Sequence, residues 1–112
     1  SGRRAAPPRI QIFHRYTGSD LGPKNDRVAA DQAVKAILAR APAVRQCIER
    51  ASPRLDRVEI ELREERPVRC EYRVVGDFHY FPFPCCQAAV ADLTLTGGVQ
   101  RVEVALDVKR TP

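Results

Sequence analysis

Residues 58–74 read VEIELREERPVRCEYRV, two runs of alternating apolar and charged side chains on either side of a polar tip. An apolar residue at every second position is the pattern of a β-strand with one buried face. The tip, Glu64–Pro67, has the composition of a hairpin loop. We therefore predict an antiparallel hairpin whose apolar side chains share one face of a sheet. The residues expected on that face are Val58, Ile60, Leu62, Val68, Cys70, Tyr72 and Val74.

Strand patterns also occur near both ends of the chain. In residues 101–109, apolar side chains again alternate with charged ones. Close to the N-terminus, Ile10 and Ile12 alternate with polar neighbours, and His14 is a further candidate for the same face. These patterns predict a final strand and a short first strand.

Two helical stretches separate the predicted strands. Residues 17–25 contain two glycines and a proline, which predict a loop before the first stretch. That stretch carries an apolar stripe at helical spacing, interrupted by Pro42, so we expect a kink or two abutting helices with Pro42 in the first turn of the second. A shorter helix begins near Pro84, with Cys86 and Val90 on one side. The longer stripe consists of Val34, Ile37, Leu38, Ala41, Val44, Cys47, Ile48 and Ala51.

The order of elements is thus β-α-β-β-α-β. Alternating strands with one apolar face predict an α+β fold, in which a mainly antiparallel sheet carries the helices packed on one face. A chain of 112 residues has room for one modest hydrophobic core. We expect a single domain at residues 10–112, preceded by a disordered basic leader at residues 1–9.

The formal net charge of +5 favours nucleic-acid binding at first sight. Three of the 19 basic residues lie in the leader, however, and removing them leaves 16 against 14 acidic residues. The outward strand residues also alternate in sign, whereas a nucleic-acid platform needs exposed aromatic side chains and a basic rim. The sequence therefore argues against a nucleic-acid partner. A ferredoxin-like nucleic-acid-binding domain with a basic N-terminal arm is kept as an alternative.

An even number of cysteines in a small chain indicates a disulfide framework. In an oxidising compartment we expect two disulfides, and three pairings are open. In a reducing compartment the same residues would be thiols, or Cys85 and Cys86 with His79 would form a small metal-binding module. Because the chain has no Cys-x-x-Cys pair and only His14 and His79 as further ligands, we expect no metal site. The four cysteines are Cys47, Cys70, Cys85 and Cys86.

Residues 76–86 read GDFHYFPFPCC and hold four of the seven aromatic residues of the chain. Two prolines make this segment a stiff loop. Either its rings fold back and fill one end of the core, or some remain exposed and bind a protein partner, since aromatic side chains are enriched in interface cores. A mixed arrangement would bury Phe81 and Phe83 and expose Phe78 and Tyr80. The candidate partner-binding residues are Phe78, His79, Tyr80, Phe81 and Phe83.

Catalytic and cofactor-binding motifs are not evident in the sequence. Both histidines lie beside aromatic residues, no Gly-rich phosphate loop precedes a helix, and no serine lies in a nucleophile elbow. We therefore expect no enzyme and no cofactor. No apolar run is long enough for a membrane-spanning helix.

Residues 44–51, VRQCIERA, resemble the helix signature of TonB C-terminal-like domains. The nearest variety is the two-cysteine one that ends adventurous gliding-motility envelope proteins. In that family a second cysteine opens a short helix and a glycine leads the final strand, and here Cys86 and Gly97 are placed similarly. The resemblance covers residues 34–108.

The resemblance implies a periplasmic or secreted domain that belongs to a larger envelope machine and binds proteins without catalysis. It also implies a disulfide between Cys47 and Cys86. Cys70 and Cys85, which are additional to the family pattern, would then pair with each other. The expected function is a non-catalytic protein-interaction domain of a bacterial cell-envelope protein, stabilised by disulfides, that docks an envelope component through the 76–84 loop or through a sheet edge.

Overall fold

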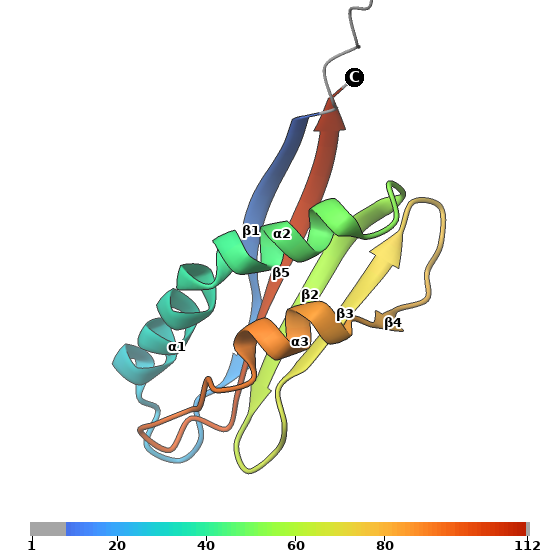
Figure 1. Cartoon of the computed structure of the whole chain (residues 1–112). Helices are drawn as coiled ribbons and strands as arrows, with labels where there is room; N and C mark the ends of the chain where they lie inside the picture. The colour runs from blue at the N-terminus through green and yellow to red at the C-terminus, as the bar shows by residue number, and fades with distance from the viewer. Residues whose placement is uncertain (1–8, 112) are drawn as a thin grey trace, which may run out of the picture.

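The computed structural model describes residues 9–111 of the chain. A five-stranded antiparallel sheet in the order β1-β5-β2-β3-β4 forms one layer, and three helices form the other (Figure 1). The strands are β1 (Arg9–Asp20), β2 (Leu55–Arg63), β3 (Arg69–Val74), β4 (Phe81–Pro82) and β5 (Arg101–Thr111). The helices are α1 (Arg27–Ala39), α2 (Ala41–Arg50) and α3 (Pro84–Val90). The predicted α+β class and element order are confirmed, and β4 is an addition. The predicted leader lies outside the described residues except for Arg9, which begins β1.

The predicted hairpin forms the centre of the sheet. In β2, Ile60 lies opposite Cys70 of β3 on one side and opposite Val104 of β5 on the other. All three side chains are fully buried. Because side chains alternate between the faces of a strand, this register places the apolar rows of three strands on one face, as the sequence predicts.

The first strand is longer than the sequence predicts. Residues 17–20, expected to be part of a loop, continue β1 and pair with β5 as far as Asp20 opposite Arg101. The register shifts between Tyr16 and Gly18, which marks a β-bulge that absorbs one extra residue. The turn-like composition of Thr17–Asp20 is therefore overridden by pairing with a strand more than 80 residues away, which no local pattern reports.

The three helices cover one face of the sheet (Figure 1). The Asp26 carboxylate accepts a hydrogen bond from the backbone N–H of Ala29 at 3.0 Å and thereby caps α1. Pro42 lies in the first turn of α2, as predicted, where its missing N–H leaves no helical hydrogen bond unmade. α1 and α2 are thus two abutting helices that meet at Arg40.

The hydrophobic core lies between the helices and the sheet. At its lower margin the turn before β5 packs closely on the start of α1. A Cβ atom on Gly97, whose φ is +67°, would lie 2.6 Å from the Cβ of Ala29, so this position requires glycine. The largest fully buried side chains include Ile37, Val44, Ile48, Leu55, Val58, Ile60, Leu62, Val90, Val102, Val104 and Leu106.

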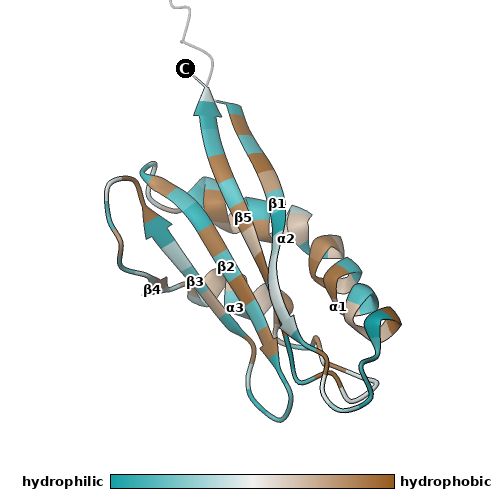
Figure 2. Ribbon diagram, turned by 180° about the vertical axis from the view of Figure 1, so that it is seen from behind, coloured by the Kyte–Doolittle hydropathy of each residue, from teal (hydrophilic) through white to brown (hydrophobic). Residues whose placement is uncertain are grey.

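The opposite face of the sheet carries no helix (Figure 2). Its side chains are mostly charged, as the alternating pattern predicts. Glu61 differs from the rest of this face, because only 3% of the residue is exposed. Its carboxylate is covered by arginines from its own strand and from both neighbouring strands.

Candidate docking site

Two disulfides hold α3 on the rest of the fold. Cys85 is bonded to Cys47 in α2, and Cys86 is bonded to Cys70 in β3. The prediction that all four cysteines form two disulfides is confirmed. The pairing implied by the resemblance, Cys47 with Cys86 and Cys70 with Cys85, is wrong because the two partners are exchanged.

The helical geometry of α3 explains this exchange. Cys86 and Val90 are four residues apart, share one face of the helix and are both fully buried. That face packs toward the sheet, where Cys70 is also fully buried. Cys85 precedes Cys86 by one residue, so it points in a different direction around the helix, and there it meets α2. The start of α3 is thereby bonded both to α2 in the helical layer and to β3 in the sheet.

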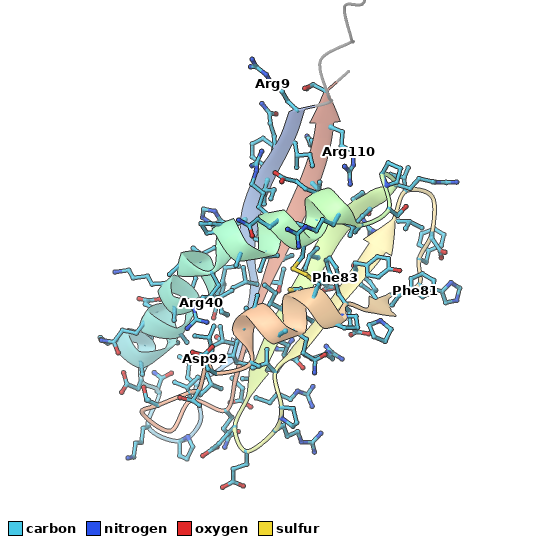
Figure 3. All side chains as sticks on the ribbon, in the orientation of Figure 1. Arg9, Arg40, Phe81, Phe83, Asp92 and Arg110 are labelled. Atoms are coloured by element: carbon cyan, nitrogen blue, oxygen red, sulfur yellow. A yellow bond between two sulfur atoms is a disulfide. The ribbon has the colours of Figure 1, made fainter. Side chains whose placement is uncertain are left out.

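The other end of α3 is held by a charged contact. The Arg40 guanidinium donates to both carboxylate oxygens of Asp92, at 2.7 and 2.8 Å, and to the carbonyl oxygen of Ala89 at 3.0 Å. Figure 3 shows Arg40 and Asp92 beside each other between α1 and the end of α3. The hydrogen bond from Arg40 lowers the pKa of Asp92 below its ordinary value. Both ends of α3 are therefore tied to the helical layer.

The segment before α3 is a loop that is fixed at both ends. At its start, the Val75 N–H donates to the Arg54 carbonyl at 2.8 Å, and Arg54 Nη2 donates to the Val75 carbonyl at 3.0 Å. At its end, the Phe83 N–H donates to the Cys70 carbonyl at 2.9 Å. Cys70 is itself disulfide-bonded, so the C-terminal end of the loop rests on a covalently held part of the sheet.

The aromatic side chains of this loop fall into three environments. Phe83 is buried and packs edge-on against Tyr72, with ring centroids 5.3 Å apart. Phe81 also packs against Tyr72, with ring centroids 5.6 Å apart, but is 40% exposed. Phe78 makes no such contact and is 92% exposed. Figure 3 shows Phe83 beside the start of α3 and Phe81 at the outer margin of the sheet.

These positions change the list of candidate partner-binding residues. Phe83 belongs to the core and is not available to a partner, which corrects its place in that list. Phe81 is also more exposed than the mixed arrangement predicts. Phe78 is presented to solvent, and His79 beside it has a side chain that is 84% exposed. Sequence analysis missed Val75, which is 53% exposed at the start of the same loop. We call the exposed residues Val75, Phe78, His79 and Phe81 the loop surface.

Tyr80 folds back over the uncovered face of the sheet. Its ring centroid lies 6.0 Å from the Arg73 guanidinium carbon, within the range of a cation–π contact. Burial of its hydroxyl, together with a hydrogen bond to the Glu59 carboxylate, raises the pKa of Tyr80. Tyr80 therefore anchors the middle of the loop and leaves Phe78 as its outermost ring.

Asp77 and His79 form a small turn beside Phe78. One carboxylate oxygen of Asp77 accepts hydrogen bonds from the backbone N–H of His79 at 2.9 Å and from its ring Nδ1 at 2.9 Å. These two hydrogen bonds lower the pKa of Asp77 below its ordinary value. The turn restricts the backbone on both sides of Phe78, so the exposed ring is carried by an ordered segment.

The centre of the uncovered sheet face is a network of ion pairs. Glu61 contacts Arg101 at 2.6 Å, Arg63 at 2.9 Å and Arg69 at 3.3 Å. Burial alone would raise the pKa of Glu61, but the Arg101 hydrogen bond and the three positive charges outweigh it and lower the pKa. The three arginines around Glu61 are thus held by a carboxylate within the face, and a hydrogen bond or ion pair already engages each of them.

The chain matches no family model, no curated protein and no solved structure. Within residues 9–111, no cluster of three or more histidine, cysteine or acidic side chains could hold a metal ion. The metal alternative also lacks its thiolates, since Cys85 and Cys86 are both oxidised. The part of the chain that the structure describes has no helix long and apolar enough to span a membrane.

Proposed function

We propose that this chain is a non-catalytic protein-interaction domain of a bacterial cell-envelope protein, working in the periplasm and docking its partner through the loop surface. The observation that carries the proposal is the 92% exposure of Phe78. A fully solvated phenylalanine loses apolar contact with water when a partner covers it, which favours binding by about 2–3 kcal/mol. Exposed aromatic anchors of this kind dominate many protein interfaces.

The way the loop is held supports the same proposal. Binding is weakened when a flexible segment has to be ordered on contact. Here the disulfide Cys70–Cys86, the hydrogen bond from Phe83 to Cys70 and the Asp77 turn order the segment before any partner arrives. A small domain with two disulfides is also typical of an oxidising compartment, which supports a periplasmic or secreted location.

The test uses three variants of the whole chain and a partner selected from a library of envelope-protein fragments. Phe78→Ala is expected to weaken partner binding at least about tenfold. Val28→Ala removes an apolar side chain that is 68% exposed on α1, away from the loop, and is the matched control. Tyr80→Phe keeps the ring but removes the hydroxyl that contacts Glu59, and should weaken binding only slightly.

Isothermal titration calorimetry gives the affinities, and circular dichroism shows that each variant is folded. Equal affinity for the Phe78→Ala variant and the unchanged chain would refute docking through the loop surface. Steeply salt-dependent binding to DNA or RNA would instead favour the nucleic-acid alternative, because phosphate contacts release counterions.

A further inference from the structure

β1 is a long edge strand with one unpaired side. It pairs with β5 along its length, and no other strand of the described residues pairs with it. Its regular part runs from Arg9 to Tyr16, before the bulge. Edge strands are usually short or interrupted by proline or lysine, because an unpaired row of N–H and C=O groups invites another strand. Residues 9–16 contain neither proline nor lysine.

A trough accompanies this edge on the side of the helices. Three hollows of about 780, 300 and 430 Å³ follow β1 from its first residues to its last. β1 contributes Ile10, then Ile12 and His14, then Tyr16, while the opposite wall passes from the end of α2 back to the start of α1. We call this row of three hollows the β1 trough. Its apolar floor and wall also include Leu21, Val34, Leu38, Pro42 and Leu106.

The inward side chains of β1 are incompletely covered. Ile10 and Ile12 are half-buried, and His14 and Tyr16 are exposed, whereas Val104 and Leu106 on the neighbouring strand are buried. A strand added beside β1 would extend the sheet by one position. Every second side chain of that strand would enter the β1 trough, where an apolar residue would cover Ile12 and Tyr16. The shape of the edge therefore favours an occupant with apolar residues at alternate positions.

The charges around the edge favour acidic residues at those positions of the added strand that point away from the trough. Arg9 and Arg15 lie on the other face of β1, where the outward side chains of an added strand would lie beside them. Arg9 has no ion pair among the described residues, and Arg15 shares Asp107 with Arg57. Figure 3 places Arg9 and Arg110 at the same end of the molecule. Opposite charges on adjacent strands stabilise pairing, and like charges oppose it.

Further basic groups line the trough itself. Arg45 reaches the edge and donates to the Ile10 carbonyl at 2.6 Å, so an added strand would replace this one contact and pair with the remaining edge groups. Arg45 also pairs with Glu49 at 3.2 Å. Arg110 lines the same hollow. The acidic residues of the trough lining are Glu49 and Asp31. The basic groups on this side of the sheet are Arg27, Arg45 and Arg110, so positive charge is in excess along the trough.

We propose that β1 binds an extended segment of a protein partner in which apolar and acidic residues alternate, added to the sheet edge as a further strand. The proposal rests on the proposed function as a protein-docking domain and assigns it a second contact surface. A second copy of this chain is a poorer occupant. Antiparallel pairing of β1 with itself would bring Arg9 and Arg15 of both copies along one seam.

The probe for this inference is an acetylated and amidated peptide of sequence Glu-Val-Glu-Ile-Glu-Val-Glu. Two control peptides carry lysine in place of glutamate, or the same residues in block order. The alternating acidic peptide is expected to bind the whole chain at least about tenfold more tightly than either control. Hydrogen exchange should show slower exchange of β1 amides when it is bound. Equal binding of the three peptides, or unchanged exchange in β1, would overturn the inference.

Variants locate the site. Ile12→Lys places a charge in the trough and should weaken peptide binding at least about tenfold. Tyr16→Lys also places a charge in the trough. Because Tyr16 is already 51% exposed, this variant tests the same site without destabilising the core. Arg9→Glu should weaken binding of the acidic peptide and strengthen binding of the lysine peptide. Val28→Lys on the exposed side of α1 is the control and should change neither affinity.

Two further outcomes separate this inference from the loop surface. Phe78→Ala should leave peptide binding unchanged, because the loop lies at the opposite edge of the sheet from β1. A natural partner whose binding is weakened by Phe78→Ala but not by Tyr16→Lys would overturn the β1 site and leave the proposed function standing. A concentration-dependent dimer in sedimentation velocity, with β1 amides protected in the absence of peptide, would assign the edge to a second copy and overturn the acidic-peptide proposal.

Discussion

Removing the disulfides one at a time would show how much of the fold depends on them. The variants are Cys47→Ala/Cys85→Ala and Cys70→Ala/Cys86→Ala. The bonded residues are 38 and 16 positions apart in the chain. In the chain-entropy model, losing each closed loop lowers the free energy of unfolding by about 4 and about 3 kcal/mol, respectively. Loop length alone therefore predicts that the first variant is the less stable.

Burial of the sulfur atoms opposes that order. Cys70 and Cys86 are both fully buried, whereas in the other pair Cys47 is buried and Cys85 is exposed. Each buried sulfur removed costs about 1 kcal/mol in lost burial and cavity formation. The packing cost is thus about 2 kcal/mol for Cys70–Cys86 and about 1 kcal/mol for Cys47–Cys85. We expect the two variants to lose nearly the same stability, about 5 kcal/mol each.

Urea unfolding followed by circular dichroism measures these losses. Full reduction of the unchanged chain is the control, since the thiols still fill the core and only the loop contribution disappears. The two loops overlap between residues 70 and 85, so we expect reduction to cost about 6 kcal/mol, less than their sum. The total free energy of unfolding of a domain of this size is about 5–15 kcal/mol. A loss below about 2 kcal/mol on reduction would refute the view that the disulfides stabilise the fold by restricting the unfolded chain.

Three further predictions follow from burial and charge. Under native conditions, a phosphine should reduce Cys47–Cys85 before Cys70–Cys86, because Cys85 is exposed; mass spectrometry after alkylation would give the order, and the reverse order would contradict it. Phe83→Ala should lose about 3–4 kcal/mol of stability and Phe78→Ala less than about 0.5 kcal/mol; equal losses would place both rings in the core. Glu61→Gln should lower stability by about 2 kcal/mol at pH 7. Because its folded pKa lies below the ordinary value of 4.5, the contribution of Glu61 is complete above that pH and is lost as the pH falls through the folded pKa. The difference between the two proteins in urea unfolding should therefore shrink on acidification, and a difference independent of pH would contradict the ion-pair explanation.

The central hairpin and the helices could be predicted because their signals are local. Alternation in residues 58–74 fixes both the strands and the face that each side chain occupies. Pro42 similarly marks the start of α2, since proline is tolerated in the first turn of a helix. The end of β1 is different. Thr17–Asp20 forms a strand only because β5 lies beside it, and that pairing depends on the whole topology.

The disulfide pairing could have been predicted from the positions of the cysteines in the predicted helix and strand. Cys86 and Val90 define the buried face of α3, and Cys70 belongs to the buried row of its strand. Two side chains directed into the same core are better placed to bond than one directed inward and one directed sideways. The family resemblance pointed instead to Cys47 with Cys86. The helical position of Cys85 relative to Cys86 was the stronger physical signal.

The exposure of individual loop rings could not be predicted, because prolines and aromatic residues fit both a core plug and a contact surface. Both Phe81 and Phe83 pack against Tyr72, but only Phe83 is buried. Phe83 takes the buried side because its backbone is bonded to Cys70 and the next residue begins α3. Phe78 lies five residues earlier, beyond the reach of that anchor. The backbone contact that fixes Phe83 in the core therefore does not reach Phe78, so stability and the proposed docking depend on different residues of one loop.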